Sequence, residues 1–307
     1  MHGSRLIHIL AAWGVALAAS GAFLFVVYRY APYVLENDRN TSVWYLNSLA
    51  EECWREFDNL PPDAAVEQKQ KLLDQAAGYL RKAAALRPDA QHYQWFLLWT
   101  LYREALLTDP PDGARLSESI CMAQALWEKT GKTWSKPALF LADHFLDQKQ
   151  DDQALPFLEA VHRQESKNLR AIDGLIRIAV NKGEDEHALQ LLHEKESIAH
   201  LSTSERDLLV TLLARQEVYR EAADRLSTLV TASGSSRERW FLYALVCAGV
   251  QDRPEALRAM SVYLSASKPR EPWPSAEALG LERIPDNLLP ILTDIYRKAL
   301  SGSHQMP

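Results

Sequence analysis

The sequence has few glycines, few cysteines and little net charge. Only 12 glycines are scattered through 307 residues, so a glycine-rich loop that holds nucleotide phosphates is not expected. The net charge of −6 gives no basic surface of the kind that binds nucleic acid. The cysteines are an odd number, Cys53, Cys121 and Cys247, each in a helical pattern. We interpret them as buried small apolar groups, with a disulfide between two of them as the alternative.

Short motifs typical of common catalytic sites are also missing. The chain has no phosphate-binding loop and no Gly-x-Ser-x-Gly elbow, and His193-Glu194 lacks the second histidine of a metalloprotease helix. Five histidines between residues 144 and 200 are spread over different helix faces, which favours surface residues over a metal cluster. They are His144, His162, His187, His193 and His200. We predict a protein that is not an enzyme and that uses no cofactor and no metal.

What the sequence does contain is a fixed period, the 34 residues that separate Ala154 from Ala188. It is carried by several columns of apolar residues, and an alanine column is the clearest. Such a period is typical of stacked helical hairpins, in which each hairpin buries its apolar side against its neighbours. The columns are Ala154, Ala188, Ala222 and Ala256; Leu158, Leu192, Leu226 and Met260; Leu141, Leu175, Leu209 and Tyr243; and Phe145, Ala179, Leu213 and Cys247.

The period predicts the organisation of the chain. Residues 33–130 form two divergent hairpins with longer loops, and residues 131–270 form four regular repeats. Residues 271–307 hold a linker, a helix near 288–300 that caps the open end of the array, and a tail. The regular helix pairs are expected at 135–148 with 151–164, 169–182 with 185–198, 203–216 with 219–232, and 237–250 with 253–266.

Two sets of residues occupy places that are familiar from one family. They are Trp240, Tyr243, Ala244 and Ala256 in the last repeat, and Ala76, Leu80, Ala83 and Pro88 in the first hairpin. Over roughly residues 40 to 270 the chain resembles the tetratricopeptide repeat (TPR) family, membrane-anchored bacterial type. The resemblance implies an all-α fold, a right-handed α-solenoid of about six hairpins with a C-terminal capping helix. It also implies a protein or peptide partner in the concave groove of the solenoid.

The amino-terminal segment 6–28 is apolar and uncharged, between Arg5 and Arg29. Its length suits a helix that crosses a lipid bilayer. A cleaved signal peptide is the alternative, because Ala16-Leu17-Ala18 resembles a cleavage site. We favour an uncleaved anchor formed by residues 1–32, since the apolar run continues beyond that site. The expected location is the inner (cytoplasmic) membrane, single-pass, with the large domain in the periplasm.

Large aromatic side chains recur on successive turns of the helix expected near 92–107. They can form a contact strip for a partner, because aromatic and arginine side chains are frequent anchors of interfaces. The alternative is that Trp95 and Trp99 only pack against the preceding helix. The residues are His92, Trp95, Trp99, Tyr102 and Arg103.

A second candidate set projects in register from the regular repeats. It can accept a carboxylate or an acidic peptide through charge-assisted hydrogen bonds. Aspartates on the same face favour the alternative, a solvated face that neutralises itself, and Asp173 has the spacing of a helical ion pair with both Arg170 and Arg177. The set is Lys136, Arg170, Arg177, Asn181 and Arg215, and the aspartates are Asp143, Asp147, Asp173 and Asp207.

The expected function follows from the resemblance. The chain looks like a membrane-anchored scaffold or adaptor for protein–protein interactions in the assembly of a cell-envelope complex, such as secretion, polysaccharide export or cytochrome maturation. Tethering would raise the local concentration of a bound protein near that complex. The alternative is a regulatory subunit of a membrane enzyme, with no catalysis of its own.

Overall fold

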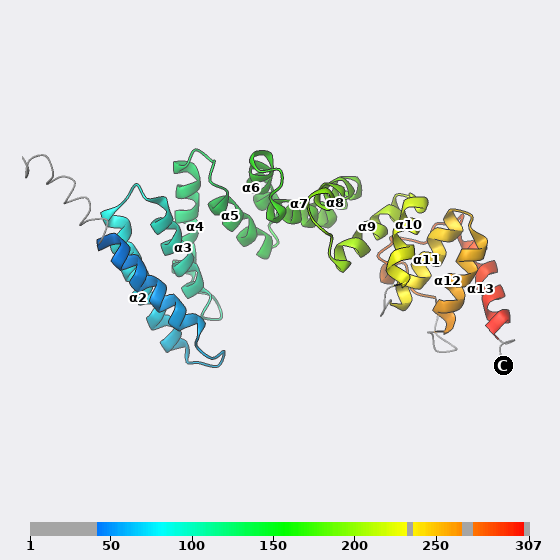
Figure 1. Cartoon of the computed structure of the whole chain (residues 1–307), viewed down its shortest axis with the longest axis horizontal. Coiled ribbons are helices and arrows are strands. Elements are labelled where there is room, and N and C mark those ends of the chain that lie inside the picture. Colours follow the sequence, from blue (N-terminus) through cyan, green and yellow to red (C-terminus); the bar gives the residue numbers. More distant parts are fainter. Residues whose placement is uncertain (1–41, 232–235, 266–272, 304–307) are drawn as a thin grey trace, which may run out of the picture. The chain divides into compact units, whose positions relative to one another are not determined.

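The computed structural model describes residues 42–231, 236–265 and 273–303, and every regular element in these ranges is a helix (Figure 1). The chain divides into two compact units, Met1–Leu141 and Ala142–Pro307. The described part of the first unit begins with a helix over 42–58. It continues with α2 (Val66–Leu86), α3 (Gln91–Ala105), α4 (Gly113–Lys129) and the first part of α5 (Ser135–Asp147).

Small residues hold the first unit together. On α2, Ala76, Ala77 and Leu80 are fully buried, and they pack against Leu97 and Leu101 of α3. Alanines at this crossing let the two backbones approach closely, as ridge-into-groove packing requires. The start of α4 is fixed by a cap, since the Asp112 carboxylate accepts a hydrogen bond from the Ala114 amide at 2.9 Å.

The second unit starts within α5, and most of its described residues form a series of helices. The predicted helix pairs from residue 135 onward are confirmed, each bound to within one residue. A 3₁₀ helix, η1, and a final helix, α13, follow the last pair. The elements are α6 (Asp151–Gln164), α7 (Leu169–Lys182), α8 (Asp185–Ile198), α9 (Thr203–Arg215), α10 (Tyr219–Thr231), α11 (Arg237–Gly249), α12 (Arg253–Ser265), η1 (Glu277–Leu279) and α13 (Leu289–Ser303).

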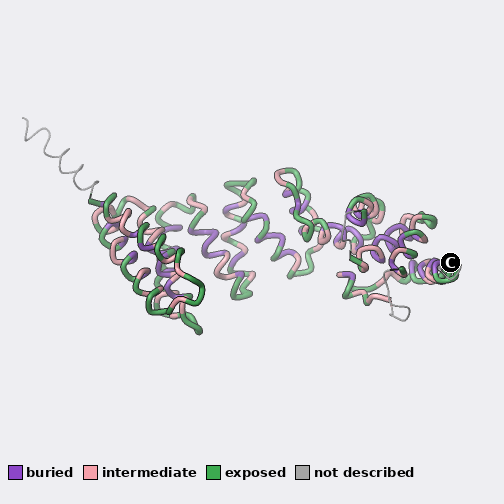
Figure 2. The backbone as a smooth tube through the Cα atoms, turned by 60° about the horizontal axis from the view of Figure 1, so that its bottom comes forward, coloured by how far each residue is buried: buried purple, intermediate pink, exposed green. Residues whose placement is uncertain are grey.

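The alanine column lies where the period places it. Ala154, Ala188, Ala222 and Ala256 are each 0% exposed. Along each helix, buried positions alternate with exposed ones, as the tube in Figure 2 shows. Where two helices cross closely, only a small side chain fits between their backbones. This is why alanine is kept at this position through four repeats.

The turn inside each hairpin repeats as closely as the core does. Lys149, Gly183, Glu217 and Gln251 occupy equivalent positions of the period, and all four have a left-handed backbone, with φ of 56°, 71°, 58° and 68°. After Gly183, the Glu184 amide donates to the Ala179 carbonyl at 2.9 Å, the Schellman ending of a helix. The same bond recurs at Gln150, Val218 and Asp252. One turn geometry is therefore used four times, although only one repeat has glycine there.

The predicted transmembrane helix has no counterpart among the described helices. The longest of them, α2, has 21 residues but carries six charged side chains, too many for a bilayer core. No helix within 42–231, 236–265 and 273–303 is both long and apolar enough to span a membrane. The fold class is therefore corrected to an all-α helical repeat without that helix, and the single-pass inner-membrane location is corrected with it. Residues 6–28 themselves lie outside the described ranges.

The C-terminal helix α13 packs against the last hairpin. Leu292 and Ile295 of α13 are buried, and α13 lies against α12 and α11. Trp273 stands between these helices, with its ring centroid 5.5 Å from those of Phe241 and Tyr296. The residues just before α13 lie against α9 and α11, as described below.

Candidate functional site

Three aromatic rings of α3 and one of α5 form a continuous aromatic strip, defined as Trp95, Trp99, Tyr102 and Phe140. The Trp95 and Trp99 rings are nearly parallel, with centroids 6.4 Å apart, and Tyr102 stacks on Trp99 at 5.8 Å. Phe140 meets all three edge-on, at 6.1, 6.0 and 4.9 Å. These are favourable aromatic geometries, so the strip is a preformed surface rather than separate side chains.

Burial within the strip is graded. Phe140 is 5% exposed and supports the other rings from below, whereas Trp99 is 40% exposed. Trp95 and Tyr102 are half-buried. Trp99 thus shows a large apolar surface to solvent while its orientation is fixed by two stacked neighbours.

Two residues that were grouped with the strip lie elsewhere. The His92 ring contacts Tyr93 and Phe96, and burial, followed by the nearby charge of Arg87, lowers the pKa of His92. The Arg103 guanidinium is 2.5 Å from the Asp58 carboxylate and lies over the Phe57 ring at 4.5 Å. Arg103 therefore serves the contact with the helix over 42–58, whereas the ring contacts of His92 lie within α3 itself. Trp134, which the sequence did not single out, extends the strip with its ring 5.8 Å from Trp95.

Most of the polar set lies in the second unit, on the first helix of successive hairpins. We use "first-helix face" for the side of these helices that carries Arg170, Gly174, Arg177 and Asn181 and the equivalent positions of the following repeats. Arg170 forms an ion pair with Asp143, and Arg177 donates to the Leu146 carbonyl at 2.8 Å. The predicted pairing of these arginines with Asp173 along α7 is not what the structure has. Lys136, in the first unit, is exposed and forms no ion pair within the described ranges.

A polar link between successive repeats recurs with the period. Asn181 donates to the Asp151 carboxylate at 2.9 Å, and in the following repeat the equivalent Arg215 donates to Asp185 at 3.2 Å. One repeat further, the same two positions hold Gly249 and Tyr219, and a Cβ on Gly249 would lie 2.5 Å from the Tyr219 ring. Asn181 and Arg215 thus join neighbouring hairpins, which favours the interpretation of a face that neutralises itself over that of a free carboxylate clamp.

Lys195 of α8 is a buried cation that sequence patterns did not reveal. It is 7% exposed and pairs with Asp173 of α7 and Glu205 of α9. Burial opposes ionisation of Glu205, but hydrogen bonds from Lys195 and Ser202 outweigh it, and the pKa of Glu205 is lowered. This cluster could not be predicted from sequence spacing because its three charged residues lie on three different helices.

The first unit also buries an ionisable group, but this one is a carboxyl group, Glu104, rather than a lysine. The side chain of Glu104 is 1% exposed, and its carboxylate lies 2.6 Å from Arg115, which also binds Asp74 and Asp112. Burial is the largest influence on Glu104, and its pKa is raised despite the arginine. One guanidinium therefore serves three carboxylates. Within the described residues, no group of three or more His, Cys, Asp or Glu side chains is arranged to hold a metal ion.

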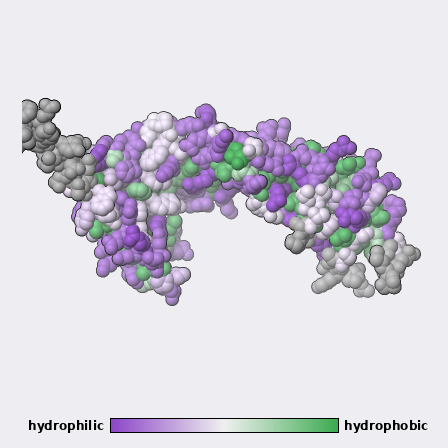
Figure 3. All heavy atoms as spheres, viewed as in Figure 1, coloured by the Kyte–Doolittle hydropathy of each residue, from purple (hydrophilic) through white to green (hydrophobic). Residues whose placement is uncertain are grey.

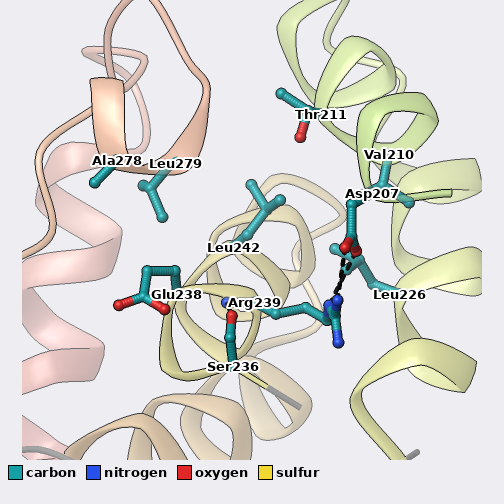
Figure 4. Close-up of a pocket in the computed structure, with 10 residues that line it drawn as sticks. All are labelled: Asp207, Val210, Thr211, Leu226, Ser236, Glu238, Arg239, Leu242, Ala278 and Leu279. Carbon is teal, nitrogen blue, oxygen red and sulfur yellow. Dashed lines mark hydrogen bonds and ion pairs between the residues drawn. The ribbon is translucent and has the colours of Figure 1, made fainter. Parts of the chain in front are cut away.

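A small cavity of about 140 Å³ opens on the first-helix face of the second unit. It lies between α9, α11 and η1, and Figure 4 shows Leu242 of α11 and Leu279 of η1 on facing walls. On its rim, Arg239 and Asp207 form two hydrogen bonds, of 3.0 and 2.6 Å. The cavity is closed on one side by the chain's own C-terminal segment.

Exposed hydrophobic surface is sparse. Hydrophilic residues predominate on the face drawn in Figure 3. Of the large hydrophobic residues that the structure describes, five are more exposed than Trp99: Trp44, Tyr45, Leu106, Val66 and Val218, at 69%, 56%, 50%, 42% and 42%. Trp99 differs from them because its ring contacts place it within a stacked surface.

Comparison with known proteins found no family model and no curated protein that matches this chain. Similar solved structures do exist. YrrB, described as a TPR protein with an unusual peptide-binding site, is 17% identical over 59% of this chain and 97% of its own, with a TM-score of 0.41. PilF of Pseudomonas aeruginosa is 14% identical over 76% and 95%, with a TM-score of 0.46.

A tetratricopeptide repeat protein from Parabacteroides merdae matches more of the chain, 82%, and 99% of its own, at 9% identity and a TM-score of 0.34. At these values the likeness extends to a row of helical hairpins and no further. The peptide-binding site is a property of YrrB.

Proposed function

We propose that this protein is a non-catalytic scaffold that binds a segment of another protein on the aromatic strip. The observation that carries the proposal is the state of Trp99, which is 40% exposed yet held between Trp95 and Tyr102 over the buried Phe140. A rigid, partly exposed tryptophan loses little conformational freedom on binding, so much of the area it buries contributes to affinity.

The chemistry of the strip selects the kind of partner. Four rings in contact present faces and edges but no charged group, and Arg103 of α3 already contacts Asp58 and Phe57. A segment with apolar or aromatic side chains fits this surface better than an acidic one. The exposed Lys136, at the start of α5, can add a charge contact at one edge.

The first-helix face of the second unit plays a different part in this proposal. Its arginines are engaged with Asp143, Asp185 and the Leu146 carbonyl, so an acidic ligand would have to break contacts that already exist. Recruitment to a cell-envelope complex was expected from the sequence and stays a prediction, because no described residue bears on it.

The test compares two exposed tryptophans of the same unit. Peptides would be selected on the full chain from a random display library, and their dissociation constants measured by fluorescence anisotropy. Trp99→Ala is expected to weaken the selected peptides by about 30-fold or more, the loss of a central interface residue. Trp44→Ala is the matched control, since Trp44 is 69% exposed and has no ring contact in the described structure.

Circular dichroism of both variants should match the parent chain. The proposal is contradicted if no peptide is enriched, or if Trp99→Ala and Trp44→Ala change the affinity of the selected peptides equally.

A further inference from the structure

The chain returns to its own repeats after the last hairpin. Residues 275–288, here called the return segment, follow α12, form η1 and lead into α13. They lie against the first-helix faces of α9 and α11, and Figure 4 shows Ala278 and Leu279 opposite Thr211 and Leu242. In a helical-hairpin array, this is a surface on which an extended ligand can lie.

Apolar contacts are one half of the attachment. Leu279, Leu281 and Leu288 are 5%, 6% and 4% exposed, although the segment around them is mostly exposed. Leu279 shares the 140 Å³ cavity with Val210 and Leu242. Leu279 therefore anchors the segment on α9 and α11, in the way that a short peptide is anchored by a side-chain pocket.

A backbone contact is the other half. The Arg215 Nε donates a hydrogen bond of 2.7 Å to the Gly280 carbonyl, while the Nη1 of the same guanidinium bonds to Asp185. Asp185 fixes the direction of the arginine, and the arginine then binds a main-chain group that any peptide possesses. Arg215 was predicted from the sequence to accept a carboxylate or an acidic peptide, and its partner here is a backbone carbonyl of the same chain.

The conformation at the contact point requires glycine. Gly280 has a φ of +70°, and a Cβ built on it would lie 2.8 Å from the Thr211 methyl group. Thr211 is β-branched and has few rotamers, so it cannot easily turn away. The Leu279-Gly280-Leu281 sequence thus matches the face of α9 in shape as well as in polarity.

We infer that the first-helix faces of α9 and α11 form a second peptide-binding site, specific for a leucine–glycine–leucine segment, and that the return segment is its resident intramolecular ligand. A partner segment of the same chemistry binds there only by displacing residues 275–288. This inference is independent of the aromatic strip, which lies in the other unit.

A single substitution separates the resident ligand from the site. In the full chain, Gly280→Val weakens the return segment but leaves the faces of α9 and α11 intact. The probe is a fluorescent peptide with the natural sequence of residues 274–288. The Gly280→Val chain should bind this peptide at least about tenfold more tightly than the unmodified chain, because occupancy by the resident segment lowers apparent affinity by the competent fraction.

Two controls make the result specific. A peptide that itself carries the Gly280→Val change should bind neither chain, and Arg283→Ala, on an exposed part of the return segment, should leave the affinity of the natural peptide unchanged. Equal affinity of the natural peptide for the Gly280→Val and unmodified chains, or equal binding of both peptides, would overturn the inference.

Hydrogen exchange of the unmodified chain gives an answer even if Gly280→Val does not fold. The Leu281 amide, which donates to the Ala276 carbonyl at 2.8 Å, should exchange at least about tenfold faster than the amides in the middle of α9 and α11. That result means that the segment leaves while the faces stay folded. Exchange of all three at one common rate means that residues 275–288 are a structural part of the repeat, and the inference fails.

Discussion

Phe140 in the first unit and Gly174 in the second occupy the same position of the period, but one fills space with a ring and the other leaves space for a neighbouring side chain. Phe140 supports three aromatic rings. Gly174 leaves room for Leu158, whose nearest methyl would lie 2.7 Å from a Cβ at that position. The alanine column keeps its residue type and the other core-facing columns stay apolar, whereas the first-helix face varies from one repeat to the next. Binding properties can therefore change on that face without loss of the fold.

The two units also treat charge differently. In the second unit, ion pairs and hydrogen bonds join one repeat to the next, as in Asn181–Asp151 and Arg215–Asp185. In the first unit, Arg115 gathers three carboxylates, and one of them is fully buried. The second unit thus uses polar contacts to join successive repeats, while the first combines an aromatic surface with a buried carboxyl group, Glu104, beside Arg115.

The largest expected effect is on the support of the aromatic strip. Phe140→Ala removes a buried ring from beneath three others and should lower the free energy of unfolding by about 3–5 kcal/mol. Urea unfolding followed by tryptophan fluorescence measures it. Phe140→Leu, which keeps most of the volume, should cost much less. A loss no greater than that of the exposed Trp44→Ala would show that the strip is not built on Phe140.

The next effect concerns the alanine column of the second unit. Ala222→Leu overpacks a helix crossing that has no free space and should cost about 1–3 kcal/mol in the free energy of unfolding. Its neighbour Ala223 is only half-buried, so Ala223→Leu is a matched control that should change stability little. Thermal and chemical unfolding of both variants decide the point, and equal stabilities would mean that the column does not set the spacing of helices.

A smaller gain is expected at the repeated turn. Glu217 is exposed and has a left-handed backbone, so Glu217→Gly should stabilise the chain by about 0.5–1 kcal/mol through relief of strain. Gly183→Ala, at the equivalent turn, should lower stability by a similar amount. Chemical unfolding of both variants measures the changes in the free energy of unfolding, which should have opposite signs. Two changes of the same sign would argue against a common turn geometry.

The smallest effect is a difference in pH dependence. The pKa of Glu205 is lowered, so its contribution to stability is present above its unfolded pKa, near the ordinary value of 4.5, and is lost as the pH falls through the folded pKa. The pKa of Glu104 is raised, so its contribution to the stability of the folded protein is present at low pH. That contribution is lost as the pH rises above about 4.5.

Unfolding curves of the Glu205→Gln and Glu104→Gln variants isolate these contributions. They would be measured between pH 3 and 7, at steps of about one pH unit. The first variant should flatten the acid side of the stability profile, and the second should remove a decline toward neutral pH. If both variants shift the profile in the same direction, the assigned contrast between the two carboxyl groups is wrong.

How far the sequence predicts the structure depends on the range of the interaction. The alanine and leucine columns predict the helix bounds because buried positions in a hairpin array recur at a fixed interval along the sequence. Ion-pair partners are not predicted: Arg170 was expected to pair with Asp173 on its own helix, but it pairs with Asp143 of α5. Local spacing cannot show which residue an adjacent helix brings near.

The misses at the candidate site have the same origin. Nothing in the period marks the return segment, because three separate leucines around a 3₁₀ turn have no helical or strand periodicity. Cys121 was expected to be a buried apolar group, but it is exposed on α4, whereas Cys53 and Cys247 are buried as expected. The strip itself was found from aromatic spacing, although its support by Phe140 depends on the next hairpin.

The most direct test of binding on the aromatic strip is site-specific photo-cross-linking in cells that produce the full chain. A photoreactive phenylalanine analogue would replace Trp99 in one variant and Trp44 in another, and the products would be separated by mass. The account predicts one dominant protein adduct at position 99 and none of that mass at position 44. The absence of an adduct at position 99, or the same adduct at both positions, would contradict it.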